Sequence, residues 1–385
     1  MRTMAVIIFF GIFFLITGLI SFYIFIRGWQ SIPPDSSFRQ AYAIVFWVVA
    51  LSFVCGRLTE NYLPSALSHL FVWMGSFWIA AMIYFLIAVV SIDMLRLINR
   101  FLPFFPSAIT QNYSQAKYII SACVTGLIGL ILLAGHINSL MPRVRKLDLS
   151  VAKQAGTMKT LNIVAASDIH LGMIVGRSRL DQIVDTINSL NPDLVLLPGD
   201  IVDEDLASVV KQNLGESLKR IRAPLGIYAV TGNHEYIGGV NEACAYLTNH
   251  NIVMLRDQSV KIADSFYLVG REDRSVGRFS GHLRKALPEL MASVDKKYPV
   301  ILMDHQPFGL NEAVAENVDL QISGHTHYGQ LWPLNYIVER IYELAWGYKN
   351  IAGTHFYISD GVGTWGPPVR IGNRPEIVNI RLNFQ

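Results

Sequence analysis

Four runs in the N-terminal third of the chain lack charged residues and are almost wholly apolar. They cover residues 3–26, 40–56, 61–92 and 118–142. A helix that crosses a bilayer needs about 20 mostly apolar residues, so the pattern predicts four transmembrane helices within residues 1–142. A cleavable signal peptide is the alternative for the first run. That run is too long for one, lacks a small-residue cleavage site after it and is followed by three more runs.

The remainder of the chain alternates short apolar runs with longer amphipathic ones. LNIVAAS (161–167) is followed by the helix-like RSRLDQIVDTINSL (177–190), by DLVLLPG (193–199), by a helical stretch near 207–221 and by GIYAVTG (226–232). Further strand-like runs lie at 252–255, 266–269, 300–303, 318–322, 355–358 and 377–382. This order predicts a β-α-β-α-β unit within an α/β domain at residues 160–385, which a basic linker at 143–159 joins to the helices.

Charge is distributed unevenly between these two parts. Residues 1–140 contain only 10 of the 61 charged residues, so the first part is suited to lipid and the second to water. The net charge is +3, without the basic stripe that a nucleic-acid-binding domain would have. Cys55, Cys123 and Cys244 lack the spacing of a metal or disulfide motif, and we expect them to be small buried apolar side chains.

Residues that can bind metal ions fall at the ends of the predicted strands. They are Asp168 and His170 in SDIH, Asp200 in GD, Asn233, His234 and Glu235 in GNHE, His305 in DH, and His325 and His327 in GHTH. Open α/β sheets bind small molecules and ions beyond the carboxyl ends of their strands, so we expect these side chains to meet there. The glycines that precede several of them permit tight turns. A lone histidine there is usually a hydrogen-bonded loop residue. However, five of the eight histidines after residue 140 fall in these motifs, which together predict a metal site.

The ordered motifs resemble those of the calcineurin-like metallophosphoesterase superfamily over residues 160–385. The segment GVGTWGPPVR through RPE (361–376) further resembles the bacterial membrane-associated branch, although Asp360 stands where that branch is expected to have Arg. The resemblance implies a β-sheet sandwich flanked by helices and a site for two divalent metal ions. By this resemblance Asp168, His170 and His327 bind one ion, Asn233, His305 and His325 bind the other, and Asp200 bridges both. Mixed oxygen and imidazole donors suit Mn, Fe, Zn or Co.

Other polar residues near these motifs have expected supporting roles. His234 directly follows a ligand position and should stabilise the transition state or protonate the leaving oxygen, with support of the ligands as the alternative. We expect Asp203 and Glu235 to orient imidazoles, as carboxylates often do around metal sites. Arg370 and Arg374 either hold a substrate phosphate or lie at the surface or a sheet edge.

Together these patterns predict a membrane-anchored phosphoesterase in which two metal ions activate water to hydrolyse a phosphomonoester, phosphodiester or pyrophosphate bond. The anchor favours a lipid-linked substrate and makes the lipid bilayer the expected partner. The alternative is a non-catalytic metal- or nucleotide-binding sensor attached to a membrane scaffold or transporter. That alternative is disfavoured because every ligand position and His234 are retained, whereas the helices lack a convincing intramembrane ionisable residue.

Charge near the helix ends predicts the orientation in the membrane. Four spans would put the N-terminus and the domain on one side. Seven Lys and Arg residues lie close to the helices on that side and five on the other. By the positive-inside rule this predicts a multi-pass protein of the cell membrane with a cytoplasmic catalytic domain.

A last amphipathic pattern covers residues 333–347, directly after His327. Its apolar residues recur at helical spacing and are Leu334, Ile337, Val338, Ile341, Leu344 and Ala345. The pattern predicts a helix over this range. Its apolar face either packs on the domain's own sheet or, with Trp332, Tyr336, Tyr342 and Trp346, contacts the bilayer or the helix bundle and guides a lipid substrate to the metals.

Overall fold

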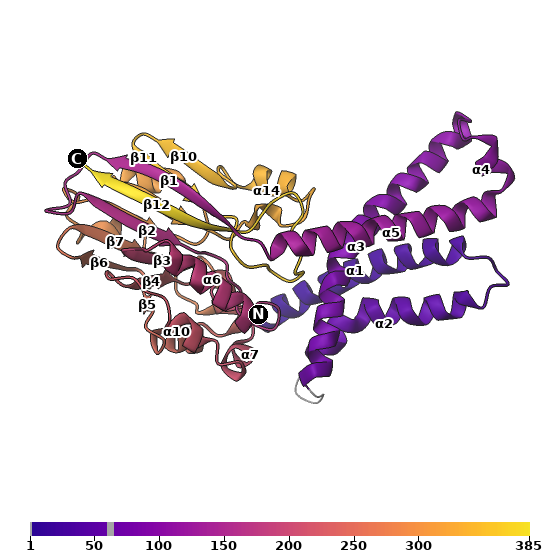
Figure 1. The fold of residues 1–385 in the computed structure, drawn as a ribbon, viewed down its shortest axis with the longest axis horizontal. Coiled ribbons are helices and arrows are strands. Elements are labelled where there is room, and N and C mark those ends of the chain that lie inside the picture. Colours follow the sequence, from indigo (N-terminus) through magenta and orange to yellow (C-terminus); the bar gives the residue numbers. More distant parts are fainter. Residues whose placement is uncertain (1, 60–64) are drawn as a thin grey trace. The chain divides into compact units, whose positions relative to one another are not determined.

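The computed structural model describes residues 2–59 and 65–385 of the chain, without the side chains of residues 2–10, 13 and 65. The chain forms two compact units, Met1–Gly135 and His136–Gln385. The helices of the first unit, as far as it is described, are α1 Arg2–Ser31, α2 Phe38–Leu58, α3 Ser65–Phe101, α4 Ser107–Gln111 and α5 Tyr113–Ser139, the last of which ends inside the second unit (Figure 1).

Three helices in the described residues are long and apolar enough to cross a membrane: Phe38–Leu58, Ala66–Phe101 and Tyr113–Ser139. They correspond to the second, third and fourth predicted spans. The first predicted span, residues 3–26, lies within α1, but residues 3–10 and 13 fall outside the described side chains. The expected apolar helices are therefore confirmed for three spans, and the count of four stays a prediction.

Helices α1, α2 and α3 pack through aromatic rings and through one close backbone approach. The ring of Phe25 in α1 stacks on Tyr42 of α2 with centroids 5.6 Å apart, and Phe46 of α2 meets Trp78 of α3 at 4.9 Å. A Cβ added to Gly75 would lie 2.2 Å from the backbone nitrogen of Phe53, so only glycine allows α2 and α3 to approach this closely.

Two six-stranded mixed sheets form the core of the second unit (Figure 1). The first has the order β1 Arg143–Val151, β12 Glu376–Phe384, β2 Thr160–Ala165, β3 Leu194–Pro198, β4 Ile227–Val230 and β5 Val253–Met254. The second has the order β10 Gly347–Ile351, β11 Thr354–Ile358, β9 Leu320–Ser323, β8 Val300–Met303, β7 Phe266–Gly270 and β6 Gln258–Ile262. Strands β2, β3 and β4 run parallel in the first sheet, as do β7, β8, β9 and β11 in the second.

Several short helices follow or connect the strands of the second unit. They are α6 Arg177–Ser189, α7 Leu206–Lys211, α8 Gly215–Leu218, α9 Asn233–Gly238, α10 Val240–Thr248, α11 Val276–Phe279, α12 Leu287–Met291, α13 Leu310–Ala315, the 3₁₀ turn η1 His327–Gly329 and α14 Asn335–Ile341. One apolar cluster joins the facing sheets, including Ile163 of β2 and Ile301 of β8. Two others join the first sheet to α6 and the second sheet to α13. The predicted α/β domain is confirmed as two packed sheets with helices outside.

The predicted basic linker at residues 143–159 is wrong over its first nine residues. Arg143–Val151 form β1, which pairs in parallel with β12 along its whole length. The side chains of Leu149 and Val151 are buried, and their exposed neighbours alternate with them. This period-two alternation is a strand pattern, and the density of Lys and Arg had obscured it.

The second unit begins within helix α5 and not in a flexible connection. His136 Nδ1 lies 2.7 Å from the carbonyl oxygen of Pro368, and Asn138 Nδ2 donates to the carbonyl oxygens of Arg370 and Asn373. Ser139 Oγ lies 3.0 Å from the same Pro368 oxygen. The last turn of α5 is thus hydrogen-bonded to the loop that precedes β12.

Candidate metal centre

The predicted ligand residues all lie in segments that follow the carboxyl ends of strands. Asp168 and His170 follow β2, Asp200 follows β3, Asn233 begins α9 after β4, His305 follows β8, and His325 and His327 follow β9. Because the first three strands are parallel neighbours, as are β8 and β9, their loops emerge at the same edge of each sheet. The structure brings the whole set together.

The backbone at this site is held in an uncommon conformation. Asp168, His170, Asp200, His325 and His327 have φ angles of 54°, 53°, 50°, 71° and 45°. Left-handed backbone is unfavourable for residues other than glycine, and such residues cluster at functional sites where the surrounding structure holds them. Gly199 has a φ of 87°, and a Cβ added there would lie 2.4 Å from His305 Nδ1, so the expected role of this glycine in a tight turn agrees with the structure.

Donor atoms converge in two adjacent groups. In the first, His170 Nε2 lies 3.0 Å from His327 Nε2, which lies 3.5 Å from Asp168 Oδ1. In the second, His305 Nε2 lies 3.1 Å from Asp200 Oδ2 and 3.3 Å from Asn233 Oδ1. Asp168, His170 and His327 form one set of donors within 4.8 Å of one another, and Asp200, His305 and His325 form another.

Buried lone pairs in these groups fit a cation. Both Asp168 and His305 are fully buried, and Asp168 Oδ2 has no hydrogen-bond partner among the described residues. His305 Nδ1 donates to the carbonyl oxygen of Pro198 at 2.8 Å, so Nε2 is the nitrogen that faces Asp200. Metal-ligating histidines commonly donate their second nitrogen to a carbonyl in this way. Burial also lowers the pKa of His325 to about 3, which leaves a neutral imidazole suited to ligation.

Asp203 lies between two imidazoles. Its Oδ1 is 2.9 Å from His234 Nδ1 and 3.4 Å from His170 Nδ1. Burial lowers the pKa of His234, but the charges of Asp200 and Asp203 outweigh burial and raise it to about 9. His234 therefore has a fixed ring and an environment that favours the protonated form.

Glu235 has a different position from the expected one. Its carboxylate accepts backbone N–H bonds from Asp200 at 3.1 Å, Ile201 at 2.7 Å, Val202 at 2.9 Å and Gly232 at 2.7 Å. It fixes the loop after β3 against the start of α9 and does not orient an imidazole. A buried carboxylate needs several donors, and here backbone amides supply them.

Comparison with known proteins agrees with this site. The family model of calcineurin-like phosphoesterases matches residues 161–329. An uncharacterized metallophosphoesterase of Aquifex aeolicus (strain VF5) is 33% identical over 250 residues, which cover 64% of this chain and 94% of that protein. The chain belongs to the calcineurin-like metallophosphoesterase family.

Two vertebrate relatives carry the word transmembrane in their names. A "Transmembrane protein with metallophosphoesterase domain" from Bos taurus is 35% identical over 259 residues, or 63% of this chain, and its counterpart from Danio rerio is 34% identical over 264 residues, or 64% of this chain. The matches span only 57% and 59% of those two proteins.

Arg370 differs from both predictions made for it. It does not lie at the surface, and its guanidinium is not free to bind a substrate phosphate. It is fully buried, and its guanidinium donates to the carbonyl oxygens of Asp360, Gly361 and Gly363. Its Nη2 also lies 3.2 Å from His327 Nδ1. In this metallophosphoesterase Arg370 therefore fixes the segment 360–363 against the predicted metal ligand His327.

Arg374 and Asp360 line a small cavity of about 290 Å³ together with Arg143, Tyr328 and Trp346. Arg374 is exposed, and its Nε donates to the carbonyl oxygen of Met141 at 2.9 Å. Asp360, the departure from the branch pattern, is fully buried, and neither of its carboxylate oxygens has a hydrogen-bond partner among the described residues. Burial raises the pKa of this carboxyl well above its usual range.

The predicted helix at 333–347 is shorter than expected and has no buried residue. Helix α14 covers only Asn335–Ile341 and ends because Tyr342 adopts extended backbone. Ile337 and Ile341 are 57% and 56% exposed, so these residues are not part of the domain's core. Leu344 and Ala345 lie beyond the helix, where Ala345 is buried.

Two aromatic residues lie near the predicted ligands, namely Trp365, for which the sequence predicted no role, and Tyr342, which was predicted only as part of the amphipathic helix. The ring of Trp365 lies 6.2 Å from that of His234, and the ring of Tyr342 lies 6.1 Å from that of His325. Trp365 is 53% exposed, so it borders the site from the solvent side. Its place in the loop GTWG after Asp360 was visible in the sequence, but its proximity to His234 depends on the fold.

Proposed function

We propose that this protein is a membrane-anchored, metal-dependent phosphoesterase with a two-ion site. The observation that carries the proposal is the pair of adjacent donor groups, with Asp200 Oδ2 3.1 Å from His305 Nε2 and 3.9 Å from His170 Nε2. Asp200 therefore has a carboxylate oxygen near histidines of both groups, as a bridging ligand requires. Mn, Fe, Zn or Co suits the mixed carboxylate, amide and imidazole donors.

The residues would divide between the two ions as follows. Asp168, His170 and His327 would hold one ion, Asn233, His305 and His325 the other, and Asp200 would contact both. Two bound divalent ions supply an activated water and stabilise the attacking and leaving oxygens of an in-line displacement. The protein's contribution is to fix these donors on rigid strand ends.

His234 would donate a proton to the leaving oxygen. Asp203, 2.9 Å from His234 Nδ1, holds the ring and favours its protonated form. The other ring nitrogen is then free to face a substrate. Trp365, next to His234, would limit the approach of bulky leaving groups.

A lipid-linked phosphoester or pyrophosphate is the substrate class that we propose. Exposed apolar and aromatic residues follow the ligand His327 closely in the chain, namely Trp332 at 47%, Tyr336 at 59%, Ile337 at 57% and Ile341 at 56% exposure. Tyr328, next to His327, hydrogen-bonds to Glu339 in α14. Trp and Tyr favour the membrane interface, so this segment would contact the bilayer and present lipid to the site.

Turnover by the purified full chain tests the enzyme against the sensor alternative. The Mn-loaded protein is assayed on a chromogenic phosphodiester and on a panel of phosphomonoesters and lipid-linked pyrophosphates. We expect metal-dependent hydrolysis of at least one substrate. Tight metal binding without turnover of any member of the panel would favour a non-catalytic sensor.

Protease treatment of intact cells tests the proposed cytoplasmic location of the catalytic domain. The three apolar helices and the transmembrane names of two relatives support membrane association. We expect the domain to be protected until the membrane is disrupted. Its rapid removal from intact cells would reverse the proposed orientation.

A further inference from the structure

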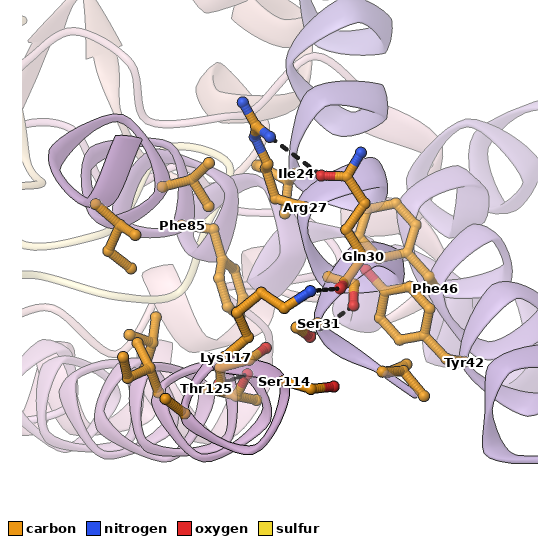
Figure 2. Close-up of a pocket in the computed structure, with 18 of the residues that line it drawn as sticks. Ile24, Arg27, Gln30, Ser31, Tyr42, Phe46, Phe85, Ser114, Lys117 and Thr125 are labelled. Atoms are coloured by element: carbon orange, nitrogen blue, oxygen red, sulfur yellow. Dashed lines mark hydrogen bonds between the residues drawn. The ribbon is translucent and has the colours of Figure 1, made fainter. Parts of the chain in front are cut away.

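The helical unit contains a large, partly open cavity that the phosphoesterase chemistry does not use. Its volume is about 1060 Å³, and α1, α2, α3 and α5 all contribute to its wall (Figure 2). Ligand pockets commonly have volumes of about 300–1,000 Å³, so the space is sufficient for a large organic molecule. Most of the wall is apolar, with Ile24, Phe46, Trp78, Phe85 and Val124 among the lining residues.

The ionisable side chains in the cavity wall are mostly basic. Four cations, Arg27, Arg39, Arg96 and Lys117, accompany a single carboxylate, Asp93. Arg27 and Lys117 reach toward Gln30 from α1 and α5 (Figure 2). All these residues lie near the last turns of α1 and α3 and the first turns of α2 and α5, so the charge is confined to one end of the unit.

The single carboxylate does not neutralise these cations. Asp93 is shared by Arg27 at 2.6 Å and Arg96 at 3.2 Å, and it also accepts a hydrogen bond from Tyr23. Arg39 and Lys117 instead donate to the backbone carbonyl oxygens of Trp29, at 3.2 Å, and Gln30, at 2.9 Å. In the described part of the chain neither of them has a carboxylate partner.

Donor capacity also remains on the arginines. The Nε atoms of Arg27 and Arg39 are buried and have no hydrogen-bond partner within residues 2–59 and 65–385. A buried charged donor without an acceptor costs free energy. An anion at this end of the cavity would satisfy both the donors and the excess positive charge.

Helix α5, which contributes to the cavity wall, is little buried by the other helices. Only 11% of the residues in its most apolar stretch are buried, against 28% in α3. The side chains of Leu127, Leu130 and Leu133 are 58%, 66% and 55% exposed. A wall so little packed against its neighbours allows entry from the apolar medium that surrounds a transmembrane helix.

We propose that this cavity binds an anionic membrane lipid, with its phosphate among Arg39, Lys117 and Arg27 and an acyl chain against Phe46 and Phe85. A soluble anion would leave the apolar wall unfilled, and an uncharged apolar molecule would leave the cations unpaired. A zwitterionic lipid would bring a second cation to a site with a positive excess. Basic pockets between transmembrane helices recognise anionic head groups by this combination. The proposal concerns the helical unit and does not depend on the phosphoesterase activity.

Lipid retention by the purified full chain tests the proposal. The detergent-solubilised protein is incubated with phosphatidylglycerol, with phosphatidylcholine of the same chains, or with inorganic phosphate, and bound molecules are counted by native mass spectrometry. We expect phosphatidylglycerol to be retained about ten-fold over phosphatidylcholine, as one charge-assisted hydrogen bond allows, and to raise the melting temperature. Equal retention of the two lipids, or retention of phosphate alone, would overturn the proposal.

Matched variants locate the site. Lys117→Gln should lower phosphatidylglycerol retention about five-fold, Lys117→Arg should preserve it, and Arg100→Gln, which removes an exposed cation of α3 outside the cavity wall, should leave it unchanged. Ser121→Phe, which would fill the apolar part, should also reduce retention, whereas Ala122→Phe on the outer side of α5 should not. Equal effects of Lys117→Gln and Arg100→Gln, or of the two phenylalanine variants, would contradict a lipid in this cavity.

Discussion

The two units place their apolar and polar side chains in opposite ways. In the α/β unit Ile163 and Leu196 are fully buried, whereas in the helical unit Leu19 and Leu130 are 61% and 66% exposed. The described helices of the second, third and fourth predicted spans are long and apolar enough to cross a membrane. In a bilayer, both arrangements would remove apolar surface from water. The same residue types therefore indicate a core in one unit and an outer surface in the other.

Both units also concentrate ionisable groups in one place, but with different charge. The α/β unit joins Asp168 and Asp200 with several imidazoles in a buried site at strand ends. The helical unit gathers four cations around Asp93. Carboxylates and neutral imidazoles suit a metal ion, and excess cations suit an anionic head group.

Removing the proposed bridging carboxylate should have the largest effect. Asp200→Asn should lower turnover by more than about 100-fold and reduce bound metal, since even residues outside the ligand set cost about 10–100-fold. Activity assays and elemental analysis of the purified variant measure both quantities. Asp264→Asn, which changes a 99% exposed carboxylate, serves as the control. Wild-type turnover with two bound metals in Asp200→Asn would exclude the bridge.

His234→Ala separates catalysis from metal binding at the same site. It should lose about 10²–10⁴-fold in turnover while metal content stays unchanged, because a proton donor contributes to the transition state and not to ligation. Loss of metal in this variant would instead assign His234 to the ligand set.

Equal truncations in the two units should differ in their effect on stability. Leu196→Ala creates a cavity in the sheet core and should cost about 2–5 kcal/mol of unfolding free energy. Leu130→Ala on the outer side of α5 should change it by less than about 0.5 kcal/mol. Denaturation of the full chain in detergent measures both variants. A comparable loss in Leu130→Ala would mean that this face of α5 is packed against protein.

Helix α14 tests whether the α/β unit has its own lipid-facing surface. The double change Ile337→Ser and Ile341→Ser should leave the melting temperature and the activity on a soluble phosphoester nearly unchanged, because both side chains are more than half exposed. Activity on lipid substrate in vesicles should fall several-fold, since less apolar area would enter the interface. Ile163→Ser, at a fully buried position, is the destabilising control. Equal loss on both substrates with a lower melting temperature would contradict membrane contact.

Asp360 should give the smallest effect, a change in the pH dependence of stability. Burial raises the pKa of its carboxyl in the folded state, so the folded protein keeps the proton longer than the unfolded chain as pH rises. The free energy of unfolding is therefore highest below the unfolded-state pKa of about 4. It falls as the pH rises above that value, because the buried carboxyl resists losing its proton in the folded state. Asp360→Asn should raise the melting temperature at pH 8 and match the wild type near pH 4. A constant difference across this range would mean that Asp360 is charged in the folded protein.

Local patterns of apolar and polar residues predicted much of the fold and of the candidate site. Apolar runs without charge predicted the long helices, and runs that end in Asp, Asn or His predicted strand ends whose loops meet. These predictions depend on short-range periodicity and on the rule that parallel strands place their carboxyl ends at one edge. The sequence alone could thus gather Asp168 with Asp200, and His305 with His325, because each pair follows neighbouring parallel strands of one sheet. The packing of the two sheets on each other brings these pairs together.

Long-range contacts determine the features that local patterns did not predict, namely strand β1 and the positions of Glu235 and Arg370. The strand β1 exists because Arg143–Val151 pair with β12, more than 200 residues later. Glu235 supports the Asp200 loop because backbone amides from two loops converge on it, and Arg370 is buried because three carbonyl groups surround it. The sequence around a charged residue looks the same whether the residue lies on the surface or is buried among backbone amide and carbonyl groups. Only the tertiary fold determines whether partners are present to offset the cost of burying it.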